Sequence, residues 1–394
     1  MPDLDAARST AVAAIDAADA DLRALSLDIH SHPELNFEEH HAHAALTTFL
    51  EARGFNVERG AYGMDTAFVA RTGSGGPTIA VLCEYDALPG IGHACGHNLI
   101  AAAGVATGLA LKAALGPGEG TVLVLGSPAE EGGGGKVKMI DAGAFDGVDA
   151  AMMLHPSPRD AAWANVIAIE QYSVRYEGRN AHASAMPWEG INALDAIVTA
   201  YQSIAVMRQQ LRPTDRVHGV ILEGGLKPNI IPDRTLAEYY IRARNAKELE
   251  ELRGKILPCF EGAATATGCT VEIEPQGLPY TDLVNNDRLC ETYAENMSTL
   301  ELQLPNKAQS LSGVGASTDM GNVSYVVPSI HPMFGIPSEA ANHTPGFTAA
   351  AATPEAHRAM LRAATALALT ALDSYLKPGV LDAARDEFKK MEAS

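Results

Sequence analysis

Apolar residues recur at helical spacing in the first part of the chain. The spacing predicts a helix that runs to about Leu25 and a second helix over residues 37–55, which Gly54 ends. Between them, the segment "HSHPELNFEE" (residues 30–39) lacks this periodicity and predicts a loop. The chain therefore begins with two helices joined by a polar connection.

Nearly continuous apolar runs then alternate with helical patterns. Runs at 66–71, 78–87, from Gly120 and at 150–158 predict strands, and the patterns at 98–115 and 136–145 predict helices. Strands that are apolar on both faces indicate an α/β domain around a mostly parallel sheet. Ligands of such sheets gather beyond the carboxyl ends of the strands. Polar residues stand at three of these ends: in the segment 84–97, at 130–131 and at His155.

From about Ile167 the order of patterns becomes strand, helix, strand, strand, helix, strand. This βαββαβ order is that of a split, ferredoxin-like unit. We therefore predict an inserted domain over residues 167–284 and one α/β domain formed by residues 1–166 and 285–394. An amphipathic helix over residues 353–376 closes the pattern.

Composition narrows the class of protein. The 394 residues include 29 Lys and Arg against 48 Asp and Glu, so the net charge of −19 argues against binding of nucleic acid. No apolar run reaches the roughly 18 residues of a membrane span, and the N-terminus lacks the pattern of a signal peptide. Five scattered cysteines do not suggest a disulfide framework. We expect a cytoplasmic protein that binds no membrane.

The segment "HACGHN" (residues 93–98) is the first candidate for chemistry. Cys95 and His97 flank a glycine, so a thiolate and an imidazole can face one point, and zinc accepts both. A buried cysteine beside a surface histidine explains the motif equally well. The motif alone leaves both interpretations open.

The segment "SPAEEGGGG" (residues 127–135) is the second candidate. Glu130 and Glu131 follow a buried-type strand and precede four glycines, which allow close approach of the backbone to a ligand. Neighbouring side chains of an extended segment diverge, so one carboxylate can bind a metal while the other faces a water molecule. A solvated acidic loop is the alternative.

Two further histidines complete a possible donor set. His155 follows an apolar run in "MMLHPSP", and His343 lies in the turn "NHTPGF". With Cys95, His97 and Glu131 they offer five donors of the types that zinc prefers. Five donors and a bridging water suit two metal ions about 3.5 to 4 Å apart.

The N-terminal histidines are a weaker candidate. We expect His40, His41 and His43, which lie on a helix of mixed faces, to be solvated rather than metal-binding. His30, His32 and His93 have no role that the pattern defines.

These motifs, with "CEYDALPGIGHACGHN" (residues 83–98) foremost, resemble the dinuclear-metal amidohydrolases that include aminoacylases, carboxypeptidase G, succinyl-diaminopimelate desuccinylase and indole-acetyl-amino acid hydrolases. The resemblance extends over essentially the whole chain. It is closest to the branch with the p-aminobenzoyl-glutamate hydrolase subunit and the β-alanyl-lysine type dipeptidases. It implies a metallopeptidase catalytic domain with an inserted lid and dimerisation domain.

The resemblance also implies roles for residues. It makes metal ligands of Cys95, His97, Glu131, His155 and His343.

Other positions match residues that act without binding metal. The resemblance makes Glu130 the general base and Asp86 the carboxylate that orients a metal-bound histidine. Carboxypeptidase-like members have a metal-binding histidine where this chain has Glu84. The cysteine branch shares this difference, so Glu84 is not counted as a ligand.

In the inserted domain, "YEGRNAHASAMPWEGINALDA" (residues 176–196) matches the family's lid motif. The resemblance implies that His182 reaches over an active site, usually that of the partner subunit. Asn229 of "GGLKPNIIPD" can meet the substrate. Arg242 or Arg244 can bind a terminal carboxylate, although ion pairs on the strand face explain these arginines equally well.

The resulting hypothesis is a hydrolase of amide bonds in dipeptides or amino-acid conjugates. It is expected to use two divalent metals per chain, zinc foremost with manganese or cobalt as alternatives, and to form a homodimer through the lid. An N-acyl-amino-acid deacylase is the alternative within the class. A catalytically silent binding protein and thiol chemistry at Cys95 are the alternatives outside it.

Overall fold

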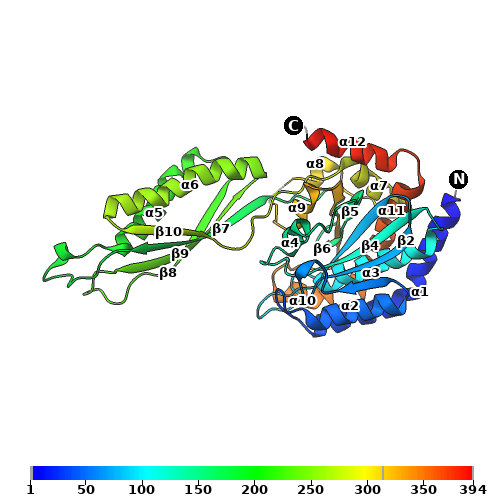
Figure 1. Ribbon diagram of the computed structural model, residues 1–394, viewed down its shortest axis with the longest axis horizontal. Helices are drawn as coiled ribbons and strands as arrows, with labels where there is room; N and C mark the ends of the chain where they lie inside the picture. The colour runs from blue at the N-terminus through cyan, green and yellow to red at the C-terminus, as the bar shows by residue number, and fades with distance from the viewer. Residues whose placement is uncertain (1–2, 313–314, 393–394) are drawn as a thin grey trace. The chain divides into compact units, whose positions relative to one another are not determined.

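The computed structural model describes residues 3–312 and 315–392, and the chain divides into two compact units (Figure 1). The first unit combines the residues up to Asn165 with those from Leu283 onward, and the second spans Val166–Asp282. From the sequence, the divisions were expected after residues 166 and 284.

A six-stranded sheet forms the centre of the first unit. Its strands are β1 (Asn56–Arg59), β2 (Phe68–Ser74), β3 (Thr78–Glu84), β4 (Gly120–Ser127), β5 (Ala150–Met152) and β11 (Ser329–Ile330). They lie in the order β1-β2-β4-β3-β5-β11, with β4, β3, β5 and β11 parallel to one another and β2 antiparallel to both of its neighbours, β1 and β4. The predicted α/β fold is confirmed. The antiparallel edge adds a detail that the sequence pattern did not specify.

Helices surround this sheet. They are α1 (Leu4–Ser31), α2 (His40–Ala52), α3 (His97–Ala114), α4 (Gly135–Asp141), α7 (Asp287–Thr299), α8 (Lys307–Ser310), α9 (Met320–Ser324), α10 (Pro345–Ala351), α11 (Pro354–Leu376) and α12 (Val380–Glu392).

Helix α3 lies at the centre of the main core. It packs against β3 and β4, and α1 and α11 cover its other sides, so it is buried nearly all round. Close packing is possible because Gly104 and Gly108 face the sheet. A Cβ at Gly104 would lie 2.4 Å from Cys83 Sγ, and one at Gly108 would lie 2.5 Å from Val124. The amino-terminal end of α3 is thereby held at the carboxyl ends of the strands.

Two elements differ from the predicted ones. Helix α1 continues six residues beyond Leu25 to Ser31, because Ile29 extends its buried stripe and His32 forms the C-cap. The apolar strand predicted to end in His155 instead breaks after Met152. His155 begins the short strand β6 (His155–Ser157), which pairs with β12 (Met333–Gly335).

The second unit is a four-stranded antiparallel sheet with two helices. Its elements are β7 (Ala168–Glu177), α5 (Ala193–Met207), β8 (Arg216–Glu223), β9 (Arg234–Ala243), α6 (Ala246–Thr267) and β10 (Thr270–Pro275). The strand order β10-β7-β9-β8 and the βαββαβ sequence confirm the predicted ferredoxin-like insertion. Both helices pack on β7 and β9 around a separate apolar core, and the far side of the sheet carries no helix of this unit (Figure 1).

Among the residues described, none of the helices combines the length and apolar character that crossing a membrane requires.

Candidate active site

The turn that carries Cys95 and His97 joins the sheet to helix α3. Gly96 caps this helix with a left-handed backbone (φ 77°), a conformation that glycine adopts without a steric penalty. A Cβ there would also lie 2.6 Å from Pro156. The glycine therefore lets the turn approach the segment that carries His155.

Cys95 belongs to two groups of side chains that could bind a metal ion. In the first group, one donor atom each of Cys95, His97 and His155 lies within 4.8 Å of the others, and the Cys95 Sγ–His155 Nε2 distance is 3.4 Å. In the second group, Cys95, Glu131 and His343 meet the same criterion. The structure thus brings together all five side chains that the sequence singled out as ligands.

Asp86 accepts a hydrogen bond from one residue of each donor group. One carboxylate oxygen accepts a hydrogen bond from His97 Nδ1 (3.1 Å), and the other accepts one from the backbone N–H of Glu131 (2.9 Å). His155 Nδ1 likewise contacts the carbonyl oxygen of Pro156 at 2.8 Å. With Nδ1 as the donor, each histidine presents the lone pair of Nε2 to the site.

The electrostatics of the site favour cations. Burial raises the pKa of the Cys95 thiol, but the charge and hydrogen bond of His155, with hydrogen bonds from His343 and His97, outweigh burial and hold it well below its usual value. Hydrogen bonds to Cys95 and Glu131 raise the pKa of His343 to about 10. The thiolate and the carboxylates therefore give the buried site an excess of negative charge.

The adjacent glutamates are affected by this excess of negative charge. Burial, together with repulsion from Glu84 and Glu131, raises the pKa of Glu130 well above its usual value. Burial and the Cys95 charge raise the pKa of Glu131. A carboxylate whose pKa is raised holds a proton more strongly and is suited to accept and return protons.

The donor set fits divalent metal ions. Glu84 Oε2 is fully buried and has no hydrogen-bond partner, and it lies 3.6 Å from His97 Nε2. Buried polar atoms without hydrogen bonds are costly, and a cation between such donors removes that cost. The two donor groups share one thiolate, and thiolate, imidazole and carboxylate together suit zinc-type ions.

A buried ion cluster beneath the site was not anticipated from the sequence. Lys136 Nζ forms ion pairs with Glu84 and with Asp319 Oδ1, the latter at 2.7 Å, and all three side chains are fully buried. Glu84 also forms a third group of close donors with His97 and Glu130. The only sequence signal for this cluster was the position of Glu84 at a strand end and of Lys136 after the glycines.

Glu39 is a second residue that sequence reasoning missed. Its buried carboxylate accepts hydrogen bonds from the backbone N–H groups of Phe37 and Ala129, both at 2.9 Å, and from the Thr66 hydroxyl at 2.8 Å. Ala129 precedes Glu130 and has a positive φ of 57°, which is unfavourable for a residue with a Cβ. Glu39 therefore stabilises the backbone conformation that presents Glu130.

A buried histidine beside the donors was also missed. The His331 ring lies 5.4 Å from that of His155, and its Nε2 forms no hydrogen bond. The signal was present, because "SIHPMF" repeats the apolar-run-then-His-Pro pattern of "MMLHPSP". His93, by contrast, contacts the Ile29 carbonyl oxygen at 3.1 Å and connects its turn to α1.

In the second unit the structure brings His182 and Asn229 together. The backbone N–H of Ala183 donates to the Asn229 carbonyl oxygen at 3.1 Å, and both residues line one small open pocket with Asn180, Ala181 and Ile230. Arg242 lies near the carboxyl end of β9 and Arg244 directly after that strand, at positions about 25 to 35 Å along the strand direction from its first residue. Within this unit, the arginines are therefore not neighbours of His182 and Asn229.

An α/β sheet whose strand ends hold two groups of metal donors and a buried carboxylate beside them defines a metal-dependent hydrolase. The chain belongs to the peptidase family M20/M25/M40, because the model of this family matches residues 76–366.

Individual relatives agree with this family. The chain is 48% identical over 402 residues to the Xaa-Arg dipeptidase of Mus musculus, a match that covers 98% of this chain and 93% of the relative. It is 30% identical to a p-aminobenzoyl-glutamate hydrolase chain of Escherichia coli, over 92% of this chain and 91% of the relative. The resemblance to this family and branch is confirmed.

A solved structure supports the fold. A dinuclear metal binding peptidase of the M20 family from Bacillus subtilis superimposes with a TM-score of 0.71 at 21% identity, covering 91% of this chain and 98% of the other. The predicted class of function, metal-dependent hydrolysis of peptide-type amide bonds, is confirmed by the family and its relatives. The silent binding protein is thereby excluded.

Proposed function

We propose that this chain is a dipeptidase that binds two divalent metal ions and cleaves dipeptides with a basic C-terminal residue. The observation that carries the proposal is the pair of donor groups that share Cys95, with Glu130 Oε2 3.9 Å from His97 Nε2. The preference for a basic residue is supported by the name of the 48% identical relative, Xaa-Arg dipeptidase. The net charge of −19 also favours cationic substrates.

In this proposal Cys95, His97 and His155 hold one ion, and Cys95, Glu131 and His343 hold the other. When bound, the ions supply Lewis-acid polarisation of the carbonyl group and lower the pKa of water. Zinc is favoured because the set combines thiolate, imidazole and carboxylate, with manganese and cobalt as alternatives.

Glu130 is the proposed general base. Its buried carboxylate accepts a proton from the attacking water and returns the proton to the nitrogen of the leaving amine. Burial and repulsion from Glu84 and Glu131 raise the pKa of Glu130, which increases the affinity of this carboxylate for a proton. Asp86 keeps His97 and Glu131 in place during the reaction.

His182 is proposed to donate a hydrogen bond to the oxygen on which negative charge develops. Its Nδ1 accepts hydrogen bonds from the backbone N–H groups of Ser184 and Ala185, both at 3.2 Å. Nε2 then carries the proton, and this is the tautomer that a donor to an oxyanion requires. Asn229, which lies beside it, is proposed to contact the substrate.

A homodimer formed through the lid is proposed as the active form. Strand β8 is an edge of the lid sheet, and a row of its side chains is exposed, including Val220 and Leu222. Helix α5 exposes Val198, Tyr201 and Val206 as well. An unpaired apolar edge of this kind favours association with another chain.

We also propose a cytoplasmic location. All five cysteines are free, and four of them are buried, as expected of a protein in a reducing compartment.

The experiment that tests the function is a substrate panel combined with metal analysis. Xaa-Arg, Xaa-Lys and neutral dipeptides and N-acetyl amino acids are assayed before and after chelation, and after zinc, manganese or cobalt is restored. We expect about two metals per chain at the catalytic donors and chelator-sensitive cleavage that is fastest for Xaa-Arg. Faster cleavage of N-acetyl amino acids would instead indicate the deacylase, and alkylation-sensitive cleavage that survives chelation would indicate thiol chemistry.

The dimer is tested by mixing two inactive variants. If His182 acts in the partner's active site, E130Q and H182A chains that exchange subunits recover about a quarter of wild-type activity, since half of the dimers then contain one complete site. No recovery after subunit exchange, which tagged chains would verify, would contradict this arrangement.

A further inference from the structure

A second cluster of metal-type donors lies on the surface of the first unit, between α1 and α2. Asp28 is on α1, His32 is the C-cap of that helix, and His41 is in the first turn of α2. One donor atom of each lies within 4.8 Å of the other two. None of the three belongs to the donor groups around Cys95.

The distances in this cluster are close to those around a tetrahedral ion. Asp28 Oδ2 lies 2.8 Å from His41 Nε2, and Asp28 Oδ1 lies 3.4 Å from His32 Nδ1. Ligand atoms bound to zinc at 2.0 to 2.1 Å are about 3.3 Å from one another. Small side-chain rotations would therefore suffice to place the three donors around one cation.

The histidine rings are already arranged side by side. The rings of His32 and His41 stack with their centroids 4.0 Å apart. His32 Nδ1, the ring nitrogen that lies 3.4 Å from Asp28 Oδ1, also lies 2.8 Å from the backbone carbonyl oxygen of Asp28 and 3.2 Å from the Ser31 hydroxyl, so an ion bound at Nδ1 would replace these contacts.

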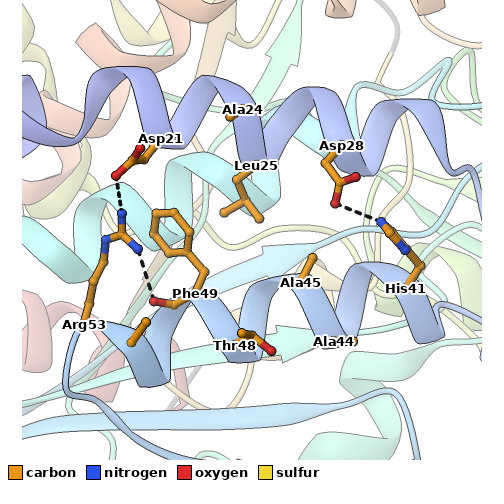
Figure 2. Close-up of a pocket in the computed structure, with 11 residues that line it drawn as sticks. Asp21, Ala24, Leu25, Asp28, His41, Ala44, Ala45, Thr48, Phe49 and Arg53 are labelled. Atoms are coloured by element: carbon orange, nitrogen blue, oxygen red, sulfur yellow. Dashed lines mark hydrogen bonds and ion pairs between the residues drawn. The ribbon is translucent and has the colours of Figure 1, made fainter.

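The cluster is accessible and borders a groove. The side chains of Asp28, His32 and His41 are 43%, 53% and 39% exposed, so an ion can enter from solvent. Figure 2 shows the groove between the two helices, with the Asp28–His41 pair at one end and Arg53 bound to Asp21 at the other. Of the two ends of the groove, only the end at Asp28 and His41 has the composition of a transition-metal site.

We propose that Asp28, His32 and His41 form a peripheral binding site for a divalent cation of the zinc type, separate from the catalytic ions. The fourth position is open to water or to a ligand from solution. An ion at this site cross-links the end of α1 to the start of α2.

This cross-link spans a segment with catalytic importance. Residues 33–39 connect the two helices, and Glu34 accepts hydrogen bonds from the backbone N–H groups of His41 and Ala42. The same segment contributes Glu39, which holds the backbone next to Glu130. A bound ion therefore stabilises the connection that ends at the active site.

Zinc binding to the full-length protein tests the proposal. Bound zinc is measured after equilibrium dialysis at buffered micromolar free zinc for the wild type, for H32A/H41A and for the control H40A, whose histidine is exposed and outside the cluster. We expect the wild type and H40A to bind about one ion per chain more than H32A/H41A.

A second comparison separates this site from the catalytic one. In a C95A background, the H32A/H41A substitution should again remove about one zinc ion per chain. Zinc should also raise the Tm of C95A more than that of C95A/H32A/H41A, because a ligand of the folded state stabilises it. Equal zinc content with and without the two histidines, in both backgrounds, would overturn the proposal whatever the outcome of the activity assays.

Discussion

Asp86 illustrates how a single carboxylate orders the catalytic unit at the residue scale. Burial alone would raise the pKa of Asp86, but the charge and hydrogen bond of His97, with the Glu131 amide and Lys136, lower it below its usual value. Asp86 is therefore ionised and accepts hydrogen bonds from two neighbouring functional residues. The orientation of His97 and of the Glu131 backbone therefore depends on hydrogen bonds to Asp86, which is not itself one of the metal-type donors.

The first residue-scale prediction concerns Glu130. E130Q keeps the size of the side chain but removes the proton acceptor, so kcat should fall by about 10² to 10⁴-fold, the usual contribution of a general base. Metal content, measured by elemental analysis, should match that of the wild type. A variant with retained kcat, or one that has lost metal, would show that Glu130 has another role.

The second residue-scale prediction concerns Glu39. E39A leaves the buried N–H groups of Phe37 and Ala129 without their acceptor, so the free energy of unfolding should fall by about 1 to 3 kcal/mol. Because Ala129 precedes Glu130, kcat should fall while KM changes little. Urea unfolding and steady-state kinetics measure both effects, and E38A, at the exposed neighbouring position, is the control. Equal behaviour of E39A and E38A would remove Glu39 from the support of the active site.

At the element scale, the first turn of α4 connects three segments through one buried lysine. Lys136 lies directly after the glycine loop that follows Glu131. Its ammonium group contacts Glu84 at the end of β3 and Asp319 just before α9, and its backbone N–H also donates to Asp319 at 2.8 Å. This turn therefore fixes the glycine loop relative to the sheet.

The element-scale prediction concerns Lys136. K136M leaves two buried carboxylates without their cation, so the free energy of unfolding should fall by about 3 to 5 kcal/mol. In K136M/E84Q/D319N, no buried charge of the cluster lacks its partner, and much of that loss should be recovered. Denaturant unfolding of both proteins measures this difference.

K138M is the matched control, because Lys138 is on the same helix but exposed, with its ammonium 4.4 Å from the Phe37 ring centroid. An exposed contact of this type contributes about 0.5 to 1 kcal/mol. If K136M costs no more than K138M, the buried cluster does not stabilise the fold.

Element types and their order were well predicted where periodicity was long, as in the inserted unit, whose strands and helices follow one another in the βαββαβ order. Prediction failed where one apolar run is divided between two strands. The run through Met152 and His155 contains two short strands that pair with different partners, and local pattern cannot show a change of partner. The end of α1 was misplaced because Ile29 is buried by distant elements.

At the scale of the whole molecule, acid should destabilise the first unit through buried neutral histidines. His43 is buried next to the Phe68 ring, and burial with the nearby Arg59 charge lowers its pKa. The sequence interpretation of His43 as solvated is therefore wrong, because it lies on the buried stripe of α2.

The prediction follows from this lowered pKa. As pH falls below about 6.5, the unfolded chain binds a proton at His43 that the folded chain resists. The stability due to neutral His43 is thus complete above that pH and is lost as pH falls towards the lowered pKa. H43L should reduce the slope of unfolding free energy against pH in this range by at most about 1.4 kcal/mol per pH unit.

Chemical denaturation between pH 7 and pH 4, roughly the range in which an unfolded histidine titrates, measures these slopes. H40A, with an exposed histidine three residues earlier, should keep the wild-type slope. A wild-type slope in H43L would mean that His43 titrates alike in both states.

The sequence by itself determined the α/β class, the inserted ferredoxin-like unit and the five candidate metal donors. These features depend on local periodicity and on donor residues at strand ends, which parallel strands bring to one edge of the sheet. Only the tertiary structure decided that Lys136 and Glu39 support the segment of the glutamates. It also decided that Asp28, His32 and His41 meet on one surface. Such contacts join segments far apart in the chain, and their distances follow from packing, which no local pattern records.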